Sequence, residues 1–274
     1  GIKQTGMPAA GILAASLLPL IALARGWRGA IGMVGIVVAL GGVSAGLLFR
    51  DIRYPDGPWA RTNRLFSSLG TVMRNRYLWT VSIMALLLIT VQLSANAYVA
   101  LYLHDIVLVD SIPDERTRVV AAGGFLALCQ MGGVAGRVLW GIVSDRIFQG
   151  RRMVVMAIIG GLMTVTSVVV GDLNPGIHLW LLSALMLVYG SVTIGFAGLY
   201  QALVVETVGK KFAATGIGLN MTVTQFGKVV GPPIFGLVVD LSGSYRPAWL
   251  LLAALAASGT VVAIVSRTGE KHLE

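Results

Sequence analysis

Long apolar runs recur along the whole of this 274-residue chain, and they constrain its fold more than any other feature. We place eight of them, with boundaries accurate to a few residues, at 6–24, 30–49, 78–102, 119–143, 153–171, 179–203, 213–239 and 248–266. At about 1.5 Å per helical residue, each run is long enough to cross roughly 30 Å of hydrocarbon. The sequence therefore predicts an all-α, polytopic transmembrane bundle of about eight spans.

The composition supports a membrane protein and argues against several classes of function. With 56% hydrophobic and 12% charged residues, the chain is more apolar and less charged than a typical soluble domain. Cys129 is the only cysteine, so the sequence has neither an internal disulfide nor a cysteine metal cluster, and the three histidines show no ligand spacing. It contains no P-loop and no nucleophile–base pair. We expect no metal, no cofactor and no enzymatic activity.

The distribution of the +9 net charge indicates the topology of the chain in the membrane rather than a surface that binds nucleic acid. The loops on one side of the predicted spans hold fourteen lysines and arginines, and those on the other side hold five. By the positive-inside rule the richer side is cytoplasmic. We therefore expect a multi-pass protein of the inner (plasma) membrane with both ends of this chain in the cytoplasm.

The stretch 136–152 (GRVLWGIVSDRIFQGRR) joins two apolar runs through an acid and a cluster of arginines. These charges can form hydrogen-bonded ion pairs at a membrane surface, and the glycines let the backbones turn and pack closely. An ordinary positively charged loop is the alternative interpretation. The stretch resembles the cytoplasmic-loop signature of the major facilitator superfamily of secondary transporters, which latches the inner gate. The resemblance implies gate roles for Gly141, Asp145, Arg146, Gly150, Arg151 and Arg152.

Two stretches of the chain echo each other. Residues 6–11 and 231–236 both read G-x-P-x-x-G, and each is followed by aromatic-Arg-x-Ala. Transporters are often built from internal repeats, although short Gly/Pro matches also arise by chance. Set against the superfamily's twelve helices, the echo pairs helices five and eleven, so the chain resembles helices five to twelve. Residues 1–49 would be the last two helices of the N-terminal bundle, 50–77 the cytoplasmic central linker and 78–274 the C-terminal six-helix bundle. The first four helices would be missing from this sequence.

Two cations lie inside predicted spans. Arg137 is eight residues before Asp145, about 12 Å into the membrane, and Lys228 is twelve residues before Asp240, about 18 Å from the outer end. An ionised residue at the centre of a span costs roughly 2.5–3.5 kcal/mol, so such residues usually line a pathway or find a partner. Snorkelling to the surface is the alternative, but 18 Å exceeds the reach of a lysine.

Other polar residues recur near these cations at helical spacing. The predicted substrate-binding residues are Arg137, Lys228, Gln92, Asn96, Asn220, Thr224, Gln225, Tyr189 and Tyr200. Helix packing is the alternative for the two tyrosines, which form a stripe with Thr193 and Phe196. Hydrogen bonds between helices are the alternative for Gln92 and Asn96.

The span interiors contain no Asp or Glu, so the two cations leave a positive potential that an anionic substrate could neutralise. This arrangement resembles oxalate/formate exchangers and monocarboxylate porters, which carry an arginine on helix eight. Arg137, in G-R-x-x-x-G-x-x-S-D, matches that position. The oxalate exchangers also use a lysine on helix eleven, and Lys228 lies on that helix about one turn from the family position.

We therefore expect a secondary transporter, a symporter or antiporter, that moves a small organic anion such as a mono- or dicarboxylate by alternating access. Pro19, Pro232 and Pro233 would bend helices along the path. A proton-coupled multidrug exporter of the same superfamily is a second hypothesis, although its antiporter motif is only loosely approximated and Lys228 would repel cationic drugs. A non-transporting membrane sensor or an inactive fragment is a third.

Overall fold

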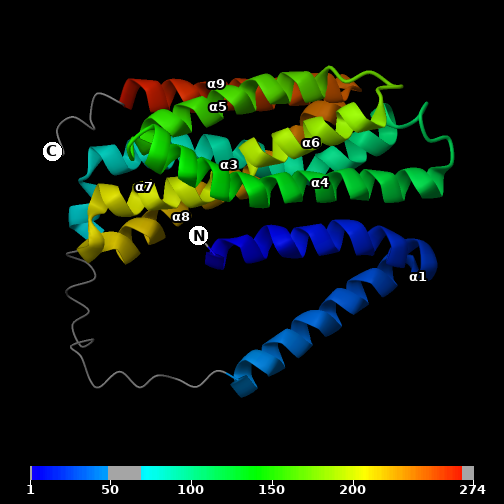
Figure 1. Cartoon of the computed structure of the whole chain (residues 1–274), viewed down its shortest axis with the longest axis horizontal. Helices are drawn as coiled ribbons and strands as arrows, with labels where there is room; N and C mark the ends of the chain where they lie inside the picture. The colour runs from blue at the N-terminus through cyan, green and yellow to red at the C-terminus, as the bar shows by residue number, and fades with distance from the viewer. Residues whose placement is uncertain (1, 49–68, 267–274) are drawn as a thin grey trace.

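The structure is a computed structural model that describes residues 2–48 and 69–266, and every regular element within them is helical. Figure 1 shows a bundle of long helices and, beside it, a hairpin formed by the first helix. The elements are α1 (Ile2–Leu48), α3 (Arg76–Tyr102), η1 (Leu103–Val107), α4 (Glu115–Ile142), η2 (Val143–Ile147), α5 (Arg152–Gly171), α6 (Leu179–Thr193), α7 (Ala197–Val208), η3 (Lys210–Phe212), α8 (Ala213–Ser242) and α9 (Tyr245–Ser266).

Seven helical segments in the described residues are long and apolar enough to cross a membrane. The first of them, Pro8–Leu48, covers most of the first two predicted spans, 6–24 and 30–49. The backbone leaves helical geometry inside it at Gly26, where φ is 74° and ψ is 165°. Because L-residues rarely adopt positive φ, a glycine suits this sharp bend. The predicted all-α transmembrane bundle is confirmed, with α1 folded back on itself.

The two limbs of α1 have different surroundings. The first limb packs against α4, where Gly123 comes so close to the carbonyl oxygen of Ala15 that an added Cβ would lie 2.6 Å from it. Residues 31–48 of the second limb are exposed on every side in the structure. This limb is strongly apolar, so it is chemically suited to contact lipid or other apolar helices.

The remaining helices form a bundle in which α5 packs on α9, α4 on α6, and α3 on both α8 and α9. Trp249, near the start of α9, is fully buried. The Trp249 ring lies 5.5 Å from those of Tyr102 and Phe235 and 6.1 Å from that of Tyr189. Since aromatic pairs add about 0.5–1.5 kcal/mol each beyond area burial, this cluster ties α3, α6, α8 and α9 together.

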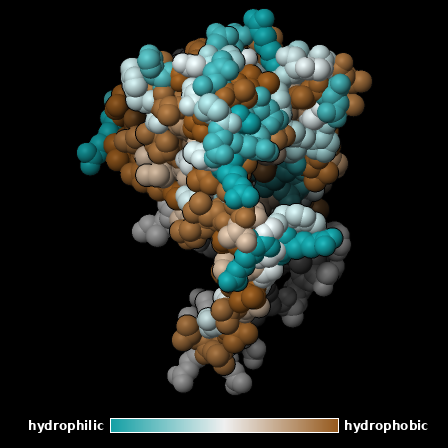
Figure 2. Space-filling model, turned by 90° about the vertical axis from the view of Figure 1, so that its right-hand side faces the viewer, coloured by the Kyte–Doolittle hydropathy of each residue, from teal (hydrophilic) through white to brown (hydrophobic). Residues whose placement is uncertain are grey.

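The helices alternate in direction, so the connections gather at two ends. The basic end carries the turns 143–151 and 209–212, with Arg146, Arg151, Arg152, Lys210 and Lys211. The opposite end carries the turns 103–114, 172–178 and 243–244. Figure 2 looks onto the opposite end, where hydrophilic residues gather in the middle while apolar residues cover much of the flanks.

Two predicted segments need comment. The predicted span 179–203 is not one continuous helix, because α6 ends at Thr193 and α7 begins at Ala197. Gly195, in the break, lies against the backbone of Gly136 on α4. Most of the predicted linker 50–77 falls outside the described residues, and residues 69–73 within it are helical. The division of the chain into parts at 1–49, 50–77 and 78–274 therefore stays a prediction.

Candidate functional site

Arg137 lies on α4 with its side chain partly buried. Its Nε and Nη1 atoms are enclosed and have no hydrogen-bond partner among the described residues. Tyr200 of α7, which is 5% exposed, interacts electrostatically with this guanidinium. A buried donor left without a partner costs about 1–3 kcal/mol, and more when it is charged. An anion at this position could accept hydrogen bonds from these nitrogens.

Glycines on two helices fix the backbone that carries Arg137. An added Cβ on Gly136 would run into the carbonyl oxygen of Ser191, and one on Gly132 into that of Leu187. Gly190 in turn lies directly against the carbonyl oxygen of Cys129. One turn after Arg137, the indole Nε1 of Trp140 donates to the carbonyl oxygen of Ser191 at 2.8 Å. The backbones of α4 and α6 are thus in contact over about two turns, which leaves Arg137 little freedom to shift.

The polar stripe predicted on α8 is divided between two environments. Asn220 and Thr224 are buried, and the amide of Asn220 donates to the hydroxyl of Ser82 on α3 at 3.0 Å. Lys228 and Gln225 are exposed, and Lys228 has no hydrogen bond or ion pair with any described residue. Asn220 and Thr224 therefore belong to the contact between α3 and α8, while Lys228 and Gln225 remain open to a ligand.

The remaining predicted substrate-binding residues, on α3, α6 and α7, also lie in different environments. Gln92 and Asn96 on α3 are partly buried, and the described residues offer neither of them a hydrogen bond. Tyr189 is completely buried beside Trp249, as helix packing would place it. Tyr200 is the one tyrosine of the predicted pair that the structure brings near Arg137.

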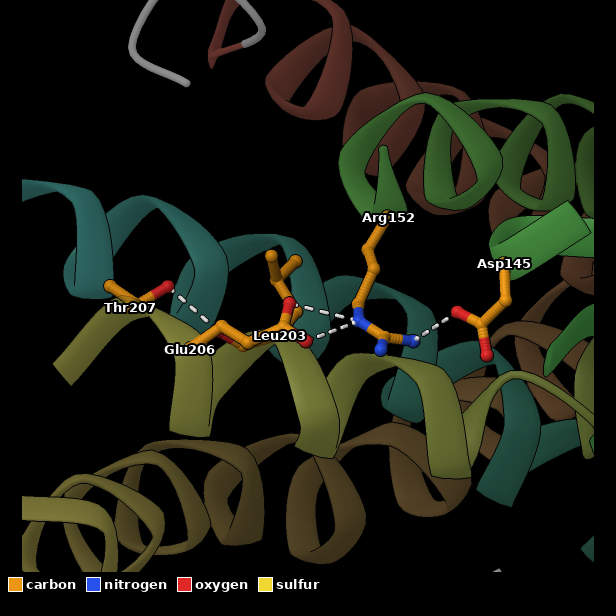
Figure 3. A network of polar contacts seen from close by, with 5 residues as sticks. All are labelled: Asp145, Arg152, Leu203, Glu206 and Thr207. Atoms are coloured by element: carbon orange, nitrogen blue, oxygen red, sulfur yellow. Dashed lines mark hydrogen bonds and ion pairs between the residues drawn. The ribbon is translucent and has the colours of Figure 1, made fainter. Parts of the chain in front are cut away.

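Arg152 is the centre of a polar network at the basic end (Figure 3). Its Nε donates to both carboxylate oxygens of Glu206, at 2.8 and 2.9 Å, and its Nη1 lies 3.5 Å from Oδ1 of Asp145. The network therefore links η2, the start of α5 and α7. Arg146 and Arg151, which were expected to join the charge cluster, are exposed and form no ion pair within the described part of the chain.

The turn between α4 and α5 places Arg152 by its backbone geometry. Gln149 and Gly150 both have positive φ, 54° and 79°, and the amide of Gly150 donates to the carbonyl oxygen of Ser144 at 2.8 Å. This closes the chain sharply after η2 and directs α5 back into the bundle. Gly141 has open space where a Cβ would be, so close packing among the described residues does not require a glycine there.

Sequence reasoning missed several residues of these networks. Glu206 follows an apolar run, on the side of the membrane predicted to be cytoplasmic. The sequence therefore placed it on the same side as the arginine cluster, and this was the only indication that it could pair with one of those arginines. At the opposite end, the hydroxyl of Tyr245 donates to Asp105 at 2.9 Å, and Nε of Arg246 donates to Asp172 at 2.6 Å. These contacts join residues 74 and 140 positions apart, which no local pattern indicates.

Comparisons with known proteins also identify transporters as the relatives of this chain. Residues 1–232 match the family model described as Major Facilitator Superfamily. "Monocarboxylate transporter 11" of Homo sapiens is 26% identical over 268 residues, which cover 96% of this chain and 55% of that protein. "Monocarboxylate transporter 13" of Rattus norvegicus is 25% identical over 271 residues, covering 96% of this chain and 58% of that protein.

A bacterial relative, "Probable galactarate/D-glucarate transporter GudP" of Bacillus subtilis, is 30% identical over 140 residues, which cover 50% of this chain and 30% of that protein. The chain spans about half the length of the monocarboxylate transporters that it matches. All three relatives are named as transporters rather than enzymes.

Proposed function

This chain belongs to the Major Facilitator Superfamily, and on that premise we propose that it carries out secondary transport of a small organic carboxylate by alternating access. Its apolar helices make it a multi-pass membrane protein. The proposal includes the bundle division at 1–49 and 78–274, with substrate bound between the two parts near the middle of the membrane.

The observation that carries the proposal is that Nε and Nη1 of Arg137 are enclosed and find no hydrogen-bond partner among the described residues. A carboxylate suits this group because its two oxygens accept parallel hydrogen bonds from a guanidinium. Removing a charge from water is unfavourable, and pairing the guanidinium with a substrate anion offsets that cost only while the substrate is bound. Lys228 adds a second cation that has no ion pair with any described residue, so both residues favour an anion over a cation.

The relatives supply independent support for the substrate class. Two of them are named for monocarboxylates, and a third for galactarate and D-glucarate. These names refer to molecules that share a carboxylate and differ in size and polarity. We therefore assign the carboxylate as the group that Arg137 binds, and other residues of the site would contact the rest of the substrate.

The network of Arg152, Asp145 and Glu206 provides a mechanism for closing the basic end. Its ion pairs connect three segments of the 78–274 part, so we propose that they hold the basic end of that part in the arrangement that closes against the 1–49 part. Because the pairs are partly exposed, each is weak enough to break and reform during a transport cycle. We propose that this end is cytoplasmic, since lysines and arginines concentrate on it, and that the membrane is the plasma membrane.

An uptake panel tests the proposal. The protein expressed from its complete reading frame is reconstituted into liposomes, and labelled mono- and dicarboxylates are compared with cationic dyes such as ethidium. We expect saturable uptake or counterflow of at least one carboxylate and none of the cations. Transport of cations alone would point to a multidrug exporter, and the absence of any flux together with retained ligand binding would point to a sensor.

A further inference from the structure

Six basic side chains at the basic end are exposed, and none of them forms an ion pair with a described residue. Two come from each of three segments, the start of α3, the α4–α5 turn and η3, and they are Arg74, Arg76, Arg146, Arg151, Lys210 and Lys211. Residues 74–76, 143–152 and 206–212 also contain two acids, Asp145 and Glu206, and Arg152 pairs with both. These stretches therefore carry seven cations, and their two acids are already engaged.

Long-range contacts bring the three segments together around the end of α7. Arg152, directly after the α4–α5 turn, donates to Glu206 in the last turn of α7 (Figure 3). At the start of α3, the side-chain amide of Asn75 donates to the carbonyl oxygen of Thr207, the next residue of α7, at 3.3 Å. The third segment, η3, follows α7 after a single residue. The exposed cations therefore form one surface, although they are up to 137 positions apart in the chain.

The starts of three helices add partial positive charge to this surface. α3, α5 and α8 all begin at the basic end, and none of them has an acid in its first turn. No side chain hydrogen-bonds to the N-caps of α5 and α8. By contrast, α4 begins at the opposite end with a cap from Asp114 and with Glu115 in its first turn. A helix start attracts negative charge, so the basic end suits an anion that comes from outside the described chain.

The apolar residues beside these cations place them at the level of the lipid headgroups. Three segments that are apolar enough to cross a membrane begin within this surface, at Arg76–Val107, Arg152–Gly171 and Lys210–Ser242. Ile147, in the α4–α5 turn, is 66% exposed, and Met73, before α3, is 47% exposed. At a membrane interface such side chains enter the boundary of the acyl chains, while arginine and lysine extend toward the headgroups.

We propose that the basic end is a docking surface for anionic phospholipids of the leaflet around it, with the six exposed cations binding headgroup phosphates. Arginine can bind a phosphate through two parallel hydrogen bonds, and lysine binds it as a point charge. Each cation near an anionic lipid surface strengthens the attraction about fivefold. The partner is a lipid rather than a nucleic acid because the cations adjoin membrane spans and exposed apolar side chains. This surface needs no transported substrate, so it is independent of the proposed function.

The test measures the binding of phosphatidylglycerol and phosphatidylcholine to the purified protein by native mass spectrometry. The wild type should prefer phosphatidylglycerol on the order of tenfold or more, and the preference should shrink as salt screens the charges. Lys210→Gln/Lys211→Gln should weaken phosphatidylglycerol binding roughly 25-fold, about fivefold for each charge. Lys210→Arg/Lys211→Arg should keep it. The matched control is Arg25→Gln/Arg116→Gln, which removes two exposed cations from the opposite end and should bind as the wild type.

A second variant covers the case in which η3 does not tolerate the substitutions. Arg146→Gln changes the α4–α5 turn and should weaken phosphatidylglycerol binding about fivefold without lowering the melting temperature. Wild-type affinity in either folded glutamine variant would overturn the proposal, and so would an equal loss in the control. Displacement of the lipid by equimolar glycerol phosphate would assign the surface to a soluble phosphate instead. Tighter binding of an oligonucleotide than of phosphatidylglycerol would assign it to nucleic acid, and either result would refute the lipid surface.

Discussion

Nε of Arg152 lies 2.8 Å from Oε1 of Glu206, so the first residue of α5 is tied to the last turn of α7, 54 positions further along the chain. The same guanidinium reaches Asp145 at 3.5 Å. The side chain of Arg152 is 19% exposed, and those of Glu206 and Asp145 are 52% and 61% exposed. One arginine therefore holds two acids from different helices at the surface of the basic end, and it is the part of the predicted gate that the structure brings together.

Glu206→Gln should weaken this gate. Exposed ion pairs contribute about 0.2–1 kcal/mol, so the substitution should shift the equilibrium toward an open basic end by roughly 1.4- to fivefold. The measurement is the labelling rate of Ser144→Cys, a buried position behind the network, by a membrane-impermeant maleimide in a Cys129→Ala background. Arg151→Gln removes an exposed arginine that forms no ion pair with any described residue, and Ser144→Cys should be labelled at its unchanged rate in that variant. Equal rates for both variants would exclude a gating role for Glu206.

Gly190→Leu should prevent α4 and α6 from packing. The added side chain would meet the carbonyl oxygen of Cys129 on the neighbouring helix, and such overpacking costs about 1–3 kcal/mol or more. We expect a lower melting temperature and loss of monodisperse protein. Gly141→Ala has open space for its methyl group and should leave the melting temperature equal or slightly higher. A stable Gly190→Leu protein would show that the helix contact is not required for folding.

The start of α4 should become less stable in acid. The backbone N–H and hydroxyl of Thr117 both donate to Asp114, and these hydrogen bonds hold the pKa of the Asp114 carboxyl below its usual value. A lowered folded-state pKa contributes stability that is present above the unfolded value and is lost as the pH falls through the folded one. The protection factors of the backbone amides in residues 115–119, which compare the exchange rate with the intrinsic rate at each pH, should therefore fall at low pH. Asp114→Ala should show low protection throughout, and wild-type protection in that variant would contradict the role of the cap.

Lys228→Gln should lower the flux of a carboxylate by about an order of magnitude, because it removes one of two cations that attract the anion. Expression and the melting temperature should not change, since Lys228 is exposed and contacts no described partner. Asn220→Leu should behave in the opposite way, with loss of stability through the broken hydrogen bond to Ser82. Uptake assays on both variants, normalised to protein amount, separate the two outcomes.

Hydropathy and spacing predicted the spans well because crossing a bilayer requires long apolar runs. The same reasoning did not place residues around each helix. Asn220, Thr224 and Lys228 follow one another at intervals of four. Gly227 and Gly231 nevertheless pack closely against α3, so that Asn220 and Thr224 are buried in this contact while Lys228 stays exposed. A glycine contact of this kind depends on which helices are neighbours, and a single helix does not reveal its neighbours.

Long-range polar contacts were the other element that the sequence left undetermined. The motif 136–152 indicated an arginine cluster, but the acid that binds Arg152 most closely is Glu206, 54 residues away. Tyr189 and Tyr200 belong to one predicted stripe, yet the break at 194–196 leaves Tyr189 in the core beside Trp249 and Tyr200 near Arg137. Only the arrangement of the helices distinguishes such positions.

The most direct measurement is the uptake rate of the best-transported carboxylate by Arg137→Gln and Arg137→Lys in liposomes. If Arg137 binds the carboxylate, the glutamine variant should lose about 10- to 100-fold, the effect of a charged hydrogen bond worth 1.5–3 kcal/mol. The lysine variant should retain part of the rate, because it keeps the charge but not the paired donors. Arg74→Gln, an exposed arginine at the basic end, should transport normally. Wild-type uptake by a folded Arg137→Gln protein would contradict the account.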